Sequence, residues 1–310
     1  MFFALVGVWL LSLVSACPED IIPPCSCRPI GTKTNEVTCT GADDVQAFDR
    51  SLAKYRGESI QTLYVMDSYL LYFPSKVFEG LNIEKLHLIN SNFRDFSDSE
   101  VAFEGLENTL KSLVIQRCTV FDGWTWKELG QLKSLTWLKT VKAGLDIIDS
   151  DIADIAHLNL EVLELTQDTV SYIDDKAFST FANLKVLSLK MNQISKVKRS
   201  MFPNPARELS QINLSYNEIE RLPEDIFTNM PSLISLILGK NKLLTLDETT
   251  FAPAWKCLNK FDISDNPLRC DCGLKWISKG HPKTTRGACS QPPSLNGTKL
   301  VDVKADDLRC

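Results

Sequence analysis

The chain has 310 residues, of which 44% are hydrophobic and 24% are charged, so it is long enough to bury a large core. Its 39 acidic and 34 basic side chains give a net charge of −5, which disfavours binding to the phosphate backbones of nucleic acids. Only three histidines are present, and they leave little material for a histidine-rich metal site.

The chain opens on an apolar run, residues 2–14, followed by the small residues Ser15 and Ala16. This pattern predicts a signal peptide over residues 1–16, cleaved before Cys17, although the usual positive charge ahead of the run is missing. A spanning helix would need about 20 apolar residues, and no second apolar stretch follows. We therefore expect a secreted, extracellular protein with no membrane span.

The ten cysteines fall mainly into two clusters, one near each end of the predicted mature chain. They lie at positions 17, 25, 27, 39, 118, 257, 270, 272, 289 and 310. Neither cluster has the paired CxxC spacing of a structural zinc site, and an exported chain meets an oxidising compartment. Disulfides are therefore predicted at both ends, but each cluster of four cysteines permits three pairings.

The middle of the chain repeats the frame L-x-x-L-x-L-x-x-N-x-L nine times, at intervals of 23 to 27 residues. The frames begin at Ile60, Ile83, Leu110, Leu135, Leu160, Leu184, Leu209, Leu233 and Leu258. This frame is identified as a leucine-rich repeat, and its period predicts an α/β solenoid shaped as a horseshoe of about nine repeats, with a parallel concave sheet and a cap at each end.

Side chains alternate across each predicted strand, so the L-x-L leucines point into the core. A ladder of phenylalanines precedes the next frame and should fill the convex half of the core; it consists of Phe78, Phe103, Phe178, Phe202, Phe227 and Phe251. The first five repeats depart from the consensus at the Asn position and at Thr140. Trp124 and Trp126 are expected to pack on the convex side rather than to bind a partner.

The outward residues of successive strands should form one continuous concave surface, and its apolar side chains gather in the first five repeats. Such side chains favour an interface, although scattered surface apolar residues are equally common. The candidate partner-binding residues are Tyr64, Met66, His87, Ile89, Val114, Trp137, Lys139 and Val141.

Two sequons, at Asn213 and Asn296, predict N-glycosylation in a secreted chain. A glycan on Asn213 would shield the second half of the concave face. A basic run in the last 45 residues suggests contact with glycosaminoglycans, but hydrated surface lysines are the commoner explanation; the run consists of Lys275, Lys279, His281, Lys283 and Arg286.

The sequence contains no GxSxG elbow, HExxH motif, P-loop or Rossmann glycine fingerprint. No catalytic residue, metal ligand or cofactor is therefore predicted, and the expected activity is non-enzymatic.

Both ends of the chain resemble the cysteine-rich caps of extracellular leucine-rich repeat proteins. Residues 17–59 resemble the N-terminal cap and residues 266–310, beginning NPLRCDCGLKWI, the C-terminal cap, which leaves residues 60–265 for the repeats. The resemblance implies that Trp276 packs on the last repeat. It also implies the disulfide pairs Cys17 with Cys27, Cys25 with Cys39, Cys270 with Cys289, and Cys272 with Cys310.

Cys118 and Cys257 lie outside both caps. Six strand spacings of about 4.8 Å place them roughly 29 Å apart, which is too far for a disulfide. Both are expected to be buried free thiols.

The motif CPEDIIPPCSC, together with an irregular first half and a regular second half, is similar to a group of secreted arthropod leucine-rich repeat proteins that includes the non-catalytic subunit of oplophorus luciferin monooxygenase. This resemblance implies a secreted scaffold that binds or stabilises another extracellular protein. The alternative is an extracellular recognition protein for adhesion, matrix or innate immunity, in the style of Slit, decorin or a receptor ectodomain.

Overall fold

The structure is a computed structural model that describes residues 17–18, 20–30 and 34–310. The predicted signal peptide, residues 1–16, lies outside the described residues.

The described chain forms short strands joined by loops, two α-helices and seven 3₁₀ helices. The strands are β1 (Cys25–Pro29), β2 (Asn35–Thr40), β3 (Ser59–Met66), β4 (Tyr69–Leu70), β5 (Asn82–Ile89), β6 (Asn92–Phe93), β7 (Ser112–Gln116), β8 (Thr119–Val120), β9 (Trp137–Val141), β10 (Ile147–Ile148), β11 (Val162–Thr166), β12 (Tyr172–Ile173), β13 (Val186–Ser188), β14 (Gln211–Asn213), β15 (Ser235–Ile237), β16 (Lys260–Asp262) and β17 (Thr284–Arg286). The helices are α1 (Val45–Ala53), η1 (Trp126–Leu129), η2 (Ser150–Ile155), η3 (Arg199–Met201), α2 (Glu248–Trp255), η4 (Cys272–Lys279), η5 (Pro293–Leu295), η6 (Leu300–Asp302) and η7 (Ala305–Asp307).

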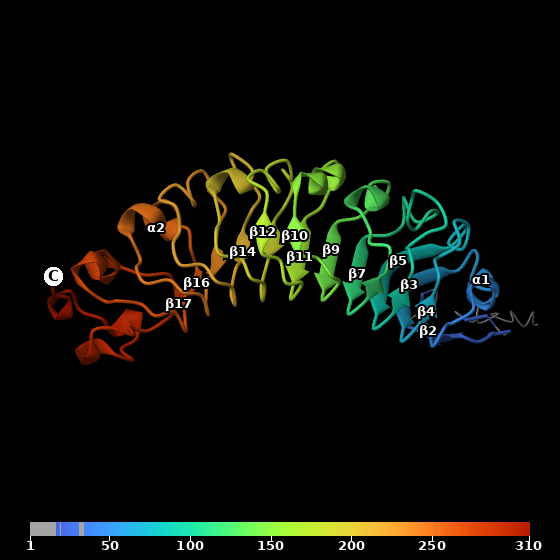
Figure 1. The fold of residues 1–310 in the computed structure, drawn as a ribbon, viewed down its shortest axis with the longest axis horizontal. Helices are drawn as coiled ribbons and strands as arrows, with labels where there is room; N and C mark the ends of the chain where they lie inside the picture. Colours follow the sequence, from blue (N-terminus) through green and yellow to red (C-terminus); the bar gives the residue numbers. More distant parts are fainter. Residues whose placement is uncertain (1–16, 19, 31–33) are drawn as a thin grey trace, which may run out of the picture.

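Twelve strands form one sheet in the order β1-β2-β3-β5-β7-β9-β11-β13-β14-β15-β16-β17. Every neighbouring pair is parallel except β1 with β2. The sheet lines the concave side of an arc, and α2 and the 3₁₀ segments of the middle repeats cover the convex side (Figure 1). The predicted solenoid with nine repeat strands is confirmed. The N-terminal cap also adds β1 and β2 to the sheet and the C-terminal cap adds β17, which the frame alone did not predict.

The core runs the full length of the arc. The six phenylalanines of the convex ladder are each at most 3% exposed, so they fill the space between the sheet and the convex segments as expected. Trp126 is 6% exposed, and Trp124 packs on Phe96 with a ring separation of 5.9 Å. The WTW segment therefore contributes to packing, as predicted.

A buried polar ladder closes most of the turns that follow the repeat strands. In the regular repeats, Asn217 accepts a hydrogen bond from the Ile194 amide at 3.0 Å and donates to the Leu189 and Leu214 carbonyls. In the first repeats serine hydroxyls accept these hydrogen bonds instead. The Ser68 hydroxyl accepts from the Ala42 amide, and the Ser91 hydroxyl accepts from the Ser68 amide. The ladder satisfies backbone groups that water cannot reach.

Three departures from the consensus belong to one cluster. Thr140, at a core leucine position, donates to the Asp168 carboxylate at 2.6 Å, and the Ala143 amide donates to the other carboxylate oxygen. Asp168, which replaces the usual Asn, is therefore hydrogen-bonded to Thr140, which replaces a core leucine. Burial raises the pKa of Asp168, and the hydrogen bonds from Thr140 and Ala143 oppose that rise.

Four disulfides lie in the caps, and they are the pairs that the resemblance implies: Cys17–Cys27, Cys25–Cys39, Cys270–Cys289 and Cys272–Cys310. Trp276 is buried, and its indole donates to the Leu246 carbonyl of the eighth repeat at 2.9 Å. Cys118 is a buried free thiol as expected, but Cys257 is exposed, so the expectation that it is buried is wrong. Cys257 follows α2 in a short link to β16, where the chain runs over the surface.

Candidate functional site: the concave face

The parallel register sets the concave side chains in straight columns across the sheet. The middle column runs from Tyr64 through His87, Val114, Lys139 and Glu164, because each of these residues is paired with the next across adjacent strands. A second column contains Met66, Ile89, Gln116 and Val141. The candidate residues from four successive repeats therefore form one surface.

Neighbouring side chains on this surface contact one another. The rings of Tyr64 and His87 meet edge to face with centroids 4.9 Å apart. Burial lowers the pKa of His87, and Lys85 lowers it further, while Glu36 opposes the change. These contacts place an aromatic pair at the N-terminal end of the concave face.

Trp137 is the most exposed large apolar side chain among the candidates, at 41%. Lys139 lies two residues further along the same strand and pairs with Glu164 at 3.0 Å, with both side chains partly shielded from water. An exposed indole beside an ordered ion pair combines an apolar anchor with a polar rim, which is typical of protein interfaces.

The other candidates are less accessible than strand alternation alone implies. Val114 is only 8% exposed, so it belongs to the floor of the face rather than to its accessible surface. Tyr64, Met66, His87, Ile89, Lys139 and Val141 are half-buried. Alternation gives the direction of a side chain, but side chains of adjacent strands contact and cover one another, as Tyr64 and His87 do.

The second half of the concave face is more polar. The Asn213 side chain accepts hydrogen bonds from the Ser215 amide at 3.0 Å and the Ser215 hydroxyl at 2.7 Å, so the sequon is folded into a local turn. Asn213 is half-buried, whereas Asn296 is exposed at the end of η5 in the C-terminal cap. Glycosylation of both residues stays a prediction.

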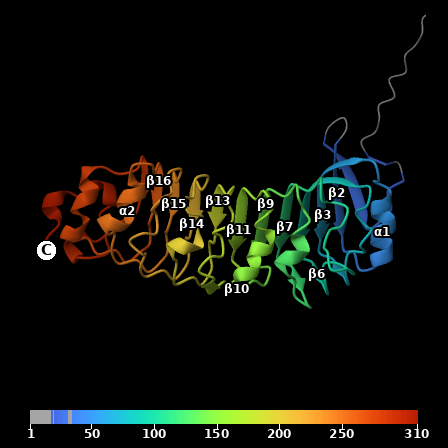
Figure 2. The same cartoon turned by 90° about the horizontal axis from the view of Figure 1, so that it is seen from above.

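Sequence reasoning missed a second apolar surface on the side of the arc. We call it the lateral stripe; it consists of Tyr69, Leu71, Phe121, Ile147 and Tyr172, which are 47% to 60% exposed. Tyr69 and Phe121 approach with ring centroids 6.4 Å apart. Figure 2 shows β6, which lies between β4 and β8 in their small sheet, and β10, which contains Ile147, along one edge of the arc. In these repeats an apolar residue lies directly beside the core residue that follows the Asn position of the frame. This pattern was the signal in the sequence that could have predicted the stripe.

The basic run lies in the C-terminal cap, and all five of its side chains are exposed. Lys279, His281 and Lys283 line a cavity of 530 Å³ together with Trp255 and Trp276. Arg286, in β17, has a guanidinium nitrogen 4.0 Å from the Asp262 carboxylate. The structure therefore brings part of the run together beside two indoles.

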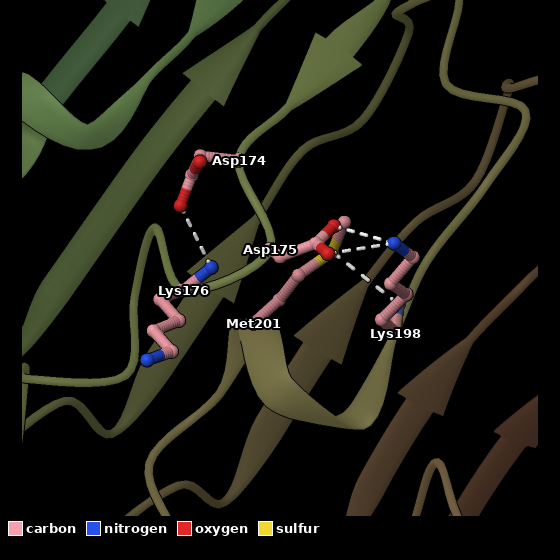
Figure 3. Close-up of polar contacts among 5 residues, drawn as sticks. All are labelled: Asp174, Asp175, Lys176, Lys198 and Met201. Atoms are coloured by element: carbon pink, nitrogen blue, oxygen red, sulfur yellow. Dashed lines mark hydrogen bonds and ion pairs between the residues drawn. The ribbon is translucent and has the colours of Figure 1, made fainter.

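Ion pairs link successive repeats outside the concave face. Lys198 donates to both carboxylate oxygens of Asp175 at 2.7 Å, and Figure 3 shows the two side chains pointing toward each other. This hydrogen bond raises the pKa of Lys198. Because both side chains are more than half exposed, such pairs add little to stability.

Among the described residues, no group of three or more His, Cys, Asp or Glu side chains could hold a metal ion. No helix in the described ranges is long and apolar enough to cross a bilayer.

Comparison with known proteins supports the repeat assignment. Residues 207–268 match the leucine-rich repeat family. The chain is 28% identical over 185 residues to mouse Toll-like receptor 9, covering 57% of this chain and 18% of the receptor. It is 31% identical over 173 residues to chicken Tsukushi, covering 55% of this chain and 43% of Tsukushi. The chain thus spans less than half the length of these curated relatives.

A crystal structure of a TLR13–ssRNA13 complex has a similar fold. The superposition gives a TM-score of 0.60 over 80% of this chain and 35% of the receptor chain, at 20% identity. This likeness concerns the fold alone. The chain thus has the leucine-rich repeat fold and is similar to Toll-like receptors and Tsukushi.

Proposed function

We propose that this chain is a secreted, non-enzymatic scaffold that binds another extracellular protein through the N-terminal half of its concave face. The observation that carries the proposal is Trp137, an indole left 41% exposed in the middle of a sheet whose other large apolar side chains are largely covered. Aromatic residues dominate the binding energy of protein interfaces. The relatives, which are recognition or receptor-type proteins, support a binding role rather than catalysis.

Two biological settings fit such a scaffold. The resemblance to the arthropod group favours an accessory or stabilising partner of another secreted protein. The Toll-like receptors and Tsukushi favour the alternative, a recognition protein in adhesion, matrix or innate immunity. A fold of this kind hosts many partners, so the setting depends on the partner itself.

Affinity purification from native extracellular fluid tests both settings. Recovery of a defined enzyme subunit supports the accessory role, whereas recovery of a receptor, matrix glycan or microbial ligand supports the alternative. A screen of ester, glycoside and oxidisable substrates tests the non-enzymatic assignment, and turnover of any of them would contradict it.

The proposed export has its own test. N-terminal sequencing of secreted material should begin at Cys17, as expected after removal of residues 1–16. Secreted material that begins at Met1 would contradict the predicted cleavage.

A further inference from the structure

A backbone hydrogen-bond ladder runs along the side of the arc where each chain segment leaves its concave strand. The Asn92 amide donates to the Ser68 carbonyl at 2.8 Å, and the Thr119 amide donates to Ser91 at 3.2 Å. The ladder is also present in the later repeats, where Gln193 donates to Val170 at 2.9 Å. These bonds join each repeat to the preceding one and close the lateral surface.

The ladder is interrupted between the third and fourth repeats. Residues 118–123 and 143–149 are all described, and no backbone hydrogen bond joins the two segments. Correspondingly, β8 ends the small sheet β4-β6-β8, and β10 begins the separate sheet β10-β12. We call this interruption the lateral gap. It leaves one edge of β8 and one edge of β10 facing the same opening.

The sequence explains the lateral gap. Ala143 occupies the position where other repeats carry Asn, Asp, Ser or Cys, so its side chain cannot accept a hydrogen bond from the preceding repeat. Gly144 follows with φ +84°, a left-handed conformation that glycine adopts without strain. Both the buried polar ladder and the lateral backbone ladder are therefore broken at one place.

A cavity of 450 Å³ occupies the lateral gap. Its walls include Thr119 and Val120 of β8 on one side and Gly144, Leu145 and Ile147 on the other. Trp124 and Trp126 also line it. Ile147 belongs at once to the cavity and to the lateral stripe, so the opening leads directly onto exposed apolar surface. Its size lies in the range of cavities that hold small ligands or protein side chains.

The charges around this cavity are mainly negative. Asp146, Asp149 and Asp151 line it, against the single cation Lys142. The Asp149 carboxylate accepts a hydrogen bond from the Asp151 amide, whereas Asp146 and Asp151 are exposed. A cationic side chain placed at this rim would be attracted, and an anionic one repelled.

We propose that the lateral gap is a second binding site, which takes an extended segment of a partner protein carrying an apolar side chain beside a basic one. The segment adds a strand at the open edges of β8 and β10, a mode in which main-chain hydrogen bonds give affinity and side-chain pockets give specificity. Its apolar side chain enters the cavity between Val120 and Ile147, and its basic side chain faces Asp146 and Asp151. The site does not depend on Trp137 or on any other concave residue.

The test uses two fluorescein-labelled peptides and fluorescence polarisation on the full chain. The first probe is SGVWVRGS, and the second, SGVWVEGS, reverses its charge. Wild-type protein should bind the arginine peptide with a Kd on the order of 10–100 μM, the range of weak peptide complexes, and the glutamate peptide at least about tenfold more weakly.

Two variants and one matched control locate the binding. Thr119→Trp fills the gap from an exposed position and should abolish binding. Gln193→Trp introduces the same side chain at the corresponding exposed position of the sixth repeat, where the ladder is intact, and should leave the Kd unchanged. Asp146→Lys combined with Asp151→Lys keeps the cavity open and should reverse the preference between the two peptides.

Hydrogen exchange tests the strand pairing. The amides of residues 144–147 should exchange faster than those of residues 193–196 in the free protein and become protected when the arginine peptide binds. No measurable binding of either peptide at 1 mM, equal binding to wild type and Thr119→Trp, or binding without protection of residues 144–147 would each overturn the proposal. Because the concave residues are untouched in every variant, these outcomes are independent of the concave-face proposal.

Discussion

Asp168 stands where the regular repeats carry Asn, and this replacement lowers the free energy of unfolding. Its carboxylate holds Thr140 and the Ala143 amide together inside the core. Burial raises its pKa above the ordinary value of 3.8. Between that value and the raised one, the folded protein keeps a proton that the unfolded chain has already released. The free energy of unfolding should therefore fall as pH rises through this window and stay constant above it.

Asp168→Asn should remove this penalty, because an amide keeps an acceptor for Ala143 and a donor toward the Thr140 hydroxyl without carrying charge. Urea unfolding across pH 3 to 8 should show the variant to be more stable than wild type at neutral pH, with the difference shrinking below pH 3.8. Asp168→Ala should instead lose about 1–3 kcal/mol, because two polar groups are left unpaired. A pH-independent difference between Asp168→Asn and wild type would contradict this account.

The two free cysteines should differ sharply in reactivity. Cys257 is exposed, whereas Cys118 is 3% exposed and burial raises its pKa. Labelling of the native protein with iodoacetamide, followed by peptide mass mapping, should modify Cys257 and leave Cys118 unmodified until the protein is denatured. Modification of both at the same rate in the native state would show that the third repeat is open.

Among the structural elements, the asparagine ladder gives the regular repeats their common turn. Asn217 is 7% exposed and bonds to four backbone groups of the sixth and seventh repeats. Asn217→Ala should therefore cost at least about 2 kcal/mol of unfolding free energy, because several buried backbone groups lose their partners. Asn259→Ala, at an exposed position before β16, serves as the control and should change stability by less than about 0.5 kcal/mol. Equal losses in the two variants would show that the ladder does not stabilise the turns.

Among the structural elements, those that recur at the repeat period could be predicted from the sequence. Features that arise from one irregular repeat could not. The L-x-L steps and the phenylalanine ladder located nine strands and the convex core, because both features recur at one spacing. The lateral gap was not predicted, since it arises from Ala143 and Gly144 acting on their neighbours in space. Val114 was expected to be accessible on the concave face but is covered there, because side-chain direction does not determine exposure. Cys257 was expected to be buried, as free cysteines usually are, but it lies in an exposed link.

For the whole molecule, the solenoid turns a repeated sequence into long, separate surfaces. The concave face could be listed residue by residue from the frame, because parallel register keeps equivalent positions side by side. Which of those residues remain accessible depends on contacts between side chains of neighbouring repeats, which no single repeat encodes. Among the large apolar candidates the structure leaves Trp137 the most accessible, and the proposed function rests on that residue.

The central claim, that partner binding uses the N-terminal half of the concave face, is tested most directly by one comparison. Trp137 and Tyr216 are matched aromatic side chains, 41% and 42% exposed, in the fourth and seventh repeats. The ring centroid of Tyr216 lies 5.3 Å from the Lys190 ammonium group and 4.8 Å from that of Lys240, outside the proposed site. Wild type, Trp137→Ala and Tyr216→Ala are first shown to have equal thermal stability, and each Kd for the partner recovered from extracellular fluid is then measured. We expect Trp137→Ala to weaken binding at least about thirtyfold, the effect of removing an interface anchor worth about 2 kcal/mol, and Tyr216→Ala to leave the Kd within about twofold of wild type. Unchanged affinity in Trp137→Ala, or an equal loss in both variants, would contradict the claim.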